Sequence, residues 1–154
     1  MAIFAKQNPM AKLILDNELI AEAFFEDACL LGIMAPLSDY HFCNLIKQDL
    51  GFDLRNDLSS EIAFTRKKRE YFFSVFKCEE PNSSVIHYVY SNKCDGEYLL
   101  PEFKHLDYVW LIHGSDAKTY PVQPLIQAVR SIAGVQLIVE LTNEKIKNKQ
   151  HLVL

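Results

Sequence analysis

The chain has 154 residues, of which 49% are hydrophobic and 23% charged, and its formal net charge is −4 at pH 7. This composition is that of an ordinary globular protein and excludes a fibrous or wholly disordered chain. The negative net charge argues against a protein whose whole surface binds nucleic acid. We predict one domain at residues 10–142, with a flexible extension at 1–9 and a frayed C-terminal tail at 143–154.

The first third of the chain carries clear strand and helix signals. Residues 11–16 predict a first strand, and the short apolar run 29–35 has the length of a buried strand. Ser38 is a typical helix N-cap, and Gly51 stands where a left-handed glycine ends a helix. We therefore expect a helix of about a dozen residues between them. A further strand is predicted at 52–56.

The middle of the chain consists of strand signals separated by turn residues. Segments 71–78 and 85–90 are rich in aromatic and β-branched residues, and the loop 79–83 joins them. This pattern predicts a hairpin. Asp95 followed by Gly96 marks another tight turn.

The last third has the strongest periodicity. An apolar stripe at helical spacing predicts a helix over 121–133, with Pro121 in its first turn and Gly134 at its end. Alternation over 135–141 predicts a strand after it. The resulting strand–helix–strand unit is expected to be parallel and right-handed. Its first strand is expected to place four residues on one face: Leu106, Tyr108, Trp110 and Ile112.

Two strand–helix–strand units therefore bracket a meander of strands. The predicted fold class is α+β, with a single mixed, mainly antiparallel sheet and two helices on one face. Within this class we expect a ferredoxin-like core with extra hairpin strands.

The cysteines and apolar runs bear on the compartment. No CxxC pair is present, which excludes a zinc ribbon or a thioredoxin-like site. No apolar run reaches the roughly 18–20 residues that span a bilayer, and the start lacks a secretory pattern. We expect a cytoplasmic protein that does not enter a membrane. Its cysteines are expected to be free thiols, mostly buried as small hydrophobes: Cys29, Cys43, Cys78 and Cys94.

The segment from Leu100 to Tyr108 combines a rigid turn with two carboxylates. Pro101 fixes the backbone at the entry, and Glu102 is suited to the start of a helical turn. Asp107 precedes an apolar strand, where a structural role predicts that it accepts hydrogen bonds from the backbone, Tyr or Lys. Two alternatives remain open. One is a partner- or ligand-binding edge, and the other is a carboxylate dyad, which needs a turn to bring both side chains together.

This segment resembles the signature of the bacterial IPExxxVDY family, with Leu in place of Ile at Leu100 and in place of Val at Leu106. Weaker similarity extends to Lys12–Asp16, to Leu37–Tyr40 and to Tyr90–Lys93. The resemblance implies a small cytoplasmic protein of about this length. It implies no activity, cofactor or catalytic residue.

One run of basic residues stands between two strand-like segments: Arg66, Lys67, Lys68 and Arg69. We expect a solvated hairpin tip there. The alternative is a contact with RNA or with an acidic protein, such as a carrier protein.

No nucleotide-binding, metalloprotease or serine-hydrolase motif occurs, and no cofactor or metal site is predicted. The leading hypothesis is a non-enzymatic protein-interaction module acting through the motif residues Pro101, Glu102, Asp107 and Tyr108 or through a sheet edge. The alternatives are a ferredoxin-like small-molecule sensor and a weak RNA-binding accessory protein acting through Arg66–Arg69. The sequence does not indicate an oligomeric state.

Overall fold

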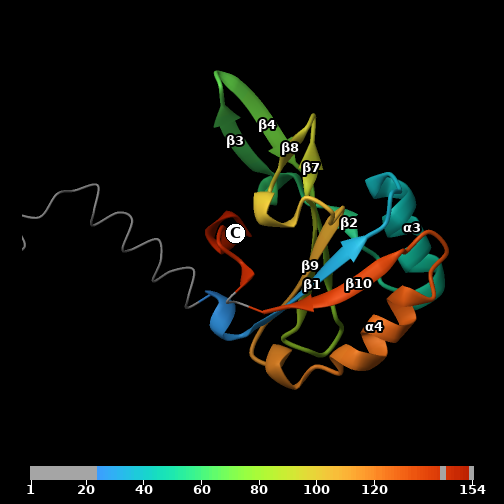
Figure 1. The fold of residues 1–154 in the computed structure, drawn as a ribbon. Coiled ribbons are helices and arrows are strands. Elements are labelled where there is room, and N and C mark those ends of the chain that lie inside the picture. Colours follow the sequence, from blue (N-terminus) through green and yellow to red (C-terminus); the bar gives the residue numbers. More distant parts are fainter. Residues whose placement is uncertain (1–23, 143–144, 153–154) are drawn as a thin grey trace, which may run out of the picture.

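The computed structural model describes residues 24–142 and 145–152 of the chain (Figure 1). The extension predicted at 1–9 and the strand predicted at 11–16 lie outside the described residues. The main element is a six-stranded sheet in which every neighbouring pair is antiparallel. Its strands, in spatial order, are β10 (Leu137–Leu141), β1 (Ala28–Met34), β9 (Tyr108–His113), β6 (Ile86–Ser91), β5 (Val75–Glu79) and β2 (Arg55–Asn56).

Two short hairpins form separate two-stranded sheets. One consists of β3 (Ile62–Arg66) and β4 (Arg69–Phe73), and the other of β7 (Lys93–Cys94) and β8 (Glu97–Tyr98). Figure 1 shows both hairpins extending from the same end of the molecule. A single strand over 71–78 is therefore wrong, because Ser74 divides the segment between two sheets.

Helix α3 (Asp39–Leu50) begins and ends where the sequence predicts. The Ser38 side chain accepts a hydrogen bond from the N–H of His41 at 3.3 Å. Gly51 ends the helix with φ +81°, a conformation that glycine adopts without a Cβ penalty. The second helix, α4 (Val122–Arg130), also follows its prediction, although it is shorter.

Both helices pack on one face of the sheet. Phe42 and Ile46 of α3 and Val129 of α4 join Trp110 and Ile33 in one buried cluster. The opposite face is covered by the base of the β3–β4 hairpin, by the loop before β9 and by the C-terminal segment. Strand β9 is consequently buried on both faces from Tyr108 to Ile112.

Two finer predictions need correction. Leu106 does not share a face with Tyr108, because the turn before β9 places it in the cluster on the helix-free face. The C-terminal segment is not frayed over its described part. Ile146 and Leu152 are buried there, and Lys149–Leu152 forms the 3₁₀ helix η5.

The α+β class and the mainly antiparallel sheet are confirmed. In both strand–helix–strand units the two strands run in the same direction. Strands β9 and β10 are parallel to each other because both pair antiparallel with β1, which lies between them. Strands β1 and β2 are parallel because three strands separate them in an antiparallel sheet. A ferredoxin-like core is not confirmed. Strand β2, which follows α3, lies at the far edge of the sheet, and β5 and β6 lie between it and β9.

Candidate functional site

The loop from Leu100 to Asp107 is held from inside by the side chain of Asn92. The Asn92 amide nitrogen donates to the carbonyl oxygens of Phe103 and Leu106, both at 2.9 Å. Its amide oxygen accepts from the N–H of Leu100 at 2.8 Å. Asn92 has no exposed surface. Its buried amide therefore supplies hydrogen-bond partners to backbone groups of the loop.

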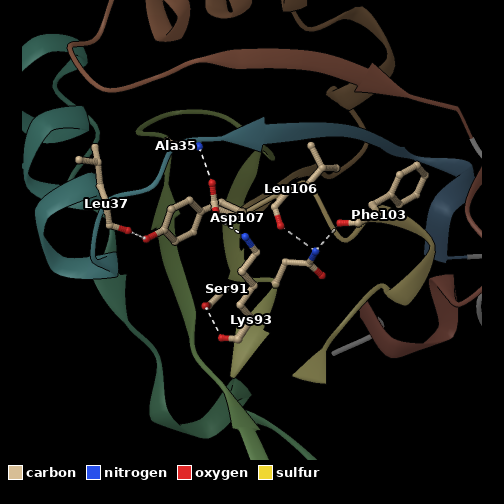
Figure 2. A network of polar contacts seen from close by, with 9 residues as sticks. Ala35, Leu37, Ser91, Lys93, Phe103, Leu106 and Asp107 are labelled. Carbon is tan, nitrogen blue, oxygen red and sulfur yellow. Dashed lines mark hydrogen bonds and ion pairs between the residues drawn. The ribbon is translucent and has the colours of Figure 1, made fainter. Parts of the chain in front are cut away.

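Asp107, at the end of this loop, joins two other segments of the chain (Figure 2). Its carboxylate accepts from the N–H of Ala35, just after β1, and from Nζ of Lys93 in β7, both at 2.7 Å. The neighbouring Tyr108 hydroxyl donates to the carbonyl of Leu37. These are the backbone and lysine partners that a structural role for Asp107 predicts.

Glu102 has a different set of partners. It lies in the 3₁₀ turn η2 (Pro101–Phe103), and its carboxylate accepts from the N–H of Lys147 at 2.6 Å and of Asn148 at 2.8 Å. The Asn148 side-chain amide donates to both of its oxygens. Burial by itself would raise the pKa of Glu102. The hydrogen bonds from Asn148 and the backbone outweigh burial and hold the pKa below its ordinary value.

The two carboxylates of the motif therefore hold different parts of the chain. Glu102 fastens the C-terminal segment, and Asp107 fastens the end of β1 to β7. Each is already occupied by hydrogen-bond donors, so the arrangement does not supply the shared proton of a carboxylate dyad.

A second buried polar chain lies on the helix-covered face. The indole N–H of Trp110 donates to Nδ1 of His87 at 2.9 Å, and Nε2 of His87 lies 3.0 Å from Oε1 of Glu80. The Tyr120 hydroxyl donates to the same oxygen at 2.6 Å. Because an indole nitrogen only donates, the imidazole carries its proton on Nε2. Burial lowers the pKa of His87, against the opposing effect of Glu80.

The hydrogen-bonded side chains around His87 do not activate a nucleophile. Cys78 lies directly opposite His87 on the neighbouring strand, but both imidazole nitrogens already have partners. Burial raises the pKa of the Cys78 thiol, and it raises that of Cys29 and of Cys43 to about 12. Thiols shifted in this direction are poor nucleophiles at neutral pH. All four cysteines are free, but the expectation that they are mostly buried is wrong, because only Cys43 is buried and the other three are half-buried.

The basic run forms the end of a projecting hairpin, as predicted. We call β3, β4 and the turn between them the basic arm. Its turn residues are Lys67 and Lys68, and its flanking arginines pair with the tip of the β7–β8 hairpin. Arg66 lies 3.3 Å from Glu97, and Arg69 lies 3.1 Å from Asp95.

The outer face of the basic arm exposes an aromatic ring. Side chains alternate along β4, so that Tyr71 and Phe73 are buried while Phe72 is 49% exposed. Tyr40 on α3 and Leu58 near β2 are the other large hydrophobic residues with high exposure in the described part of the chain. Phe72 differs from them because it lies on the same short hairpin as the basic turn.

A hollow of about 540 Å³ beside β2 is large enough for a small ligand. Its cations are already paired, Arg55 with Asp53 at 2.9 Å and Lys77 with Glu79 at 3.4 Å. The buried side-chain oxygen of Asn56 has no hydrogen-bond partner. One unpaired acceptor beside satisfied charges does not define a ligand class.

Metal ligands do not gather in the described ranges, since no group of three or more His, Cys, Asp or Glu side chains there could hold an ion. His105 is exposed, and the carboxylate of Asp107 is bound to Lys93. In these same ranges no helix is long and apolar enough to cross a membrane.

No family model matches the chain, and no curated protein matches it. Arguments about function therefore rest on its own residues.

Sequence reasoning did not identify Asn92 or the His87 chain. Asn92 lies within the segment Tyr90–Lys93, and nothing in its spacing indicates three hydrogen bonds. The available signal is a polar residue at the end of an apolar strand, nine residues before Pro101. His87 also stands in an apolar strand, where a single polar side chain requires a buried partner.

Proposed function

We propose that the protein is a non-enzymatic protein-interaction module that docks a partner through the basic arm. The observation that carries this proposal is the exposed Phe72 on a hairpin outside the main sheet. Aromatic residues are enriched at protein interfaces, where polar residues surround the apolar contact area. Asn92, Asp107, Glu102 and His87, by contrast, are engaged in holding the fold.

The arm is well suited to docking because it is held in place. Its two arginines pair with carboxylates of the β7–β8 hairpin, and their guanidinium groups lie over aromatic rings of the arm itself. Arg66 lies 5.5 Å from the centre of the Phe64 ring and Arg69 5.4 Å from that of Tyr71. A hairpin fixed in this way loses little conformational freedom on binding.

We also propose that the chain is a member of the IPExxxVDY family and acts in the reducing cytoplasm. Two of the segments that carry the resemblance are bonded to each other, since Asn92 and Lys93 hold the loop from Leu100 to Asp107. Because the two segments form one structural unit, a family that shares this loop is expected to share both sequence patterns. The free thiols suit a reducing compartment.

The docking proposal is tested by photo-crosslinking in cells. A benzophenone amino acid replaces Phe72 in one variant and Tyr40 in another. Tyr40 is the matched control because it is a 67% exposed aromatic residue on α3. We expect a discrete crosslinked species at position 72 that is absent at position 40. Equal crosslinking at both positions, or none at position 72, would refute docking through the arm.

A further inference from the structure

The turn at the end of the basic arm has a backbone that its residues do not favour. Lys67 and Lys68 both have positive φ, at 52° and 64°. A two-residue hairpin turn of this kind is normally Asn-Gly or Asp-Gly, because other residues suffer a Cβ clash there. The same chain uses Asp95 and Gly96 in its β7–β8 turn, with φ of 48° and 85°. Two lysines in such a turn indicate a role other than stability.

These two lysines also carry the unpaired charge of the arm. The flanking Arg66 and Arg69 are bound to Glu97 and Asp95. Within the described part of the chain, neither Lys67 nor Lys68 has a carboxylate within ion-pair distance, and both are exposed. The end of the arm therefore presents two adjacent ammonium groups to solvent.

The backbone beside these charges is open along one edge. Strand β3 pairs with β4 on one side, and their small sheet contains no third strand among the described residues. In a hairpin closed by two residues, alternate backbone groups point away from the partner strand. For β3 these are the N–H and C=O groups of Ala63 and Thr65, which are available for an added strand.

We propose that the basic arm binds an extended acidic segment of a protein, which adds to the β3 edge and places carboxylates against Lys67 and Lys68. This inference rests on the proposed docking function of the arm. The added strand supplies backbone hydrogen bonds, and the charges set its register.

The charges around the arm favour an acidic protein segment over RNA. The two arginines, which are the better phosphate ligands, are already paired, and their carboxylate partners lie beside the basic turn. A phosphate chain running along the hairpin would pass Asp95 and Glu97 as well as the exposed Glu70. A protein segment can confine its negative charge to the end of the arm.

The test uses a fluorescent decapeptide that carries Glu residues at one end and Val and Thr along the rest, with labelled oligouridylate as the second probe. Lys67→Asn/Lys68→Gly removes both charges and installs the preferred turn, so the protein is expected to melt at a higher temperature. We expect its affinity for the peptide to fall about tenfold at low ionic strength, from the loss of two exposed ion pairs. The matched control is Lys118→Asn/Lys145→Asn, which removes two exposed charges elsewhere and should leave binding unchanged.

A second variant tests the edge. Thr65→Pro removes an outward N–H while leaving the pairing of β3 with β4 intact, and it should weaken peptide binding without unfolding the arm. Unchanged peptide affinity in the folded Lys67→Asn/Lys68→Gly variant overturns the inference, as does tighter binding of oligouridylate than of peptide. If the Phe72-position crosslink persists in a variant with both lysines replaced, docking through the arm stands and only its acidic partner is wrong.

Discussion

Replacing Asn92 with Ala should strongly destabilise the fold, because Asn92 holds the loop from Leu100 to Asp107. The substitution removes all three side-chain hydrogen bonds. The N–H of Leu100 and the carbonyl of Leu106 are then left buried without a partner. Each such group costs roughly 1–3 kcal/mol, so we expect a loss of roughly 2–6 kcal/mol. That is a large share of the ~5–15 kcal/mol that stabilises a typical domain.

Urea unfolding followed by tryptophan fluorescence measures this loss. The chain has one Trp, Trp110, and it is fully buried, so its emission reports the transition. Asn92→Asp is an informative partner variant because it keeps an acceptor for Leu100 but turns anionic oxygens toward two carbonyls. At neutral pH it should be at least as unstable as Asn92→Ala. Ser91→Ala, which removes one exposed hydrogen bond, should cost less than about 1 kcal/mol.

A small effect would refute this account of the loop. If the free energy of unfolding of Asn92→Ala lies within about 1 kcal/mol of the wild-type value, and the denaturant slope is unchanged, the backbone groups find other partners. The loop would then be held by its apolar contacts, and Asn92 would only occupy space.

Three further predictions concern the other polar groups. Asp107→Ala should lower the free energy of unfolding by roughly 1–3 kcal/mol, and Lys93→Met by less than about 1 kcal/mol because the Lys93 side chain is much more exposed than that of Asp107. Equal losses in urea titrations would contradict this. Glu102→Gln should lower stability at neutral pH, but the difference from wild type should vanish as the pH falls from 4.5 through the lowered pKa of Glu102. The ring signals of His87 should titrate below pH 6.5 in NMR spectra. Because its lowered pKa lets the unfolded chain bind the proton first, stability should decrease as the pH falls below 6.5; titration at or above 6.5 would contradict burial as the cause.

Features determined by a few neighbouring residues were predictable from the sequence. Ser38 and Gly51 bound α3 because capping depends on groups within one helical turn. The turn at Asp95 and Gly96 follows from the freedom of glycine to adopt positive φ. The position of the basic run between two strand-like segments likewise predicted the end of the arm.

Features that depend on distant segments were not predictable in the same way. Alternation along 71–78 indicates extended chain but does not say that Ser74 separates two sheets. Leu106 was assigned to the wrong face because one 3₁₀ turn changes the phase of the alternation. The partners of Asn92 lie up to fourteen residues away. Those of Glu102 lie more than forty residues away, so no local pattern specifies them.

The burial of β9 on both faces has a consequence for how the protein unfolds. Trp110 belongs to the cluster under the helices, while its neighbours Val109 and Leu111 belong to the cluster on the opposite face. Neither cluster can therefore open fully without exposing part of the same strand. The backbone amides of β9 should be among the slowest in the chain to exchange with deuterated solvent, and both halves should melt in a single transition.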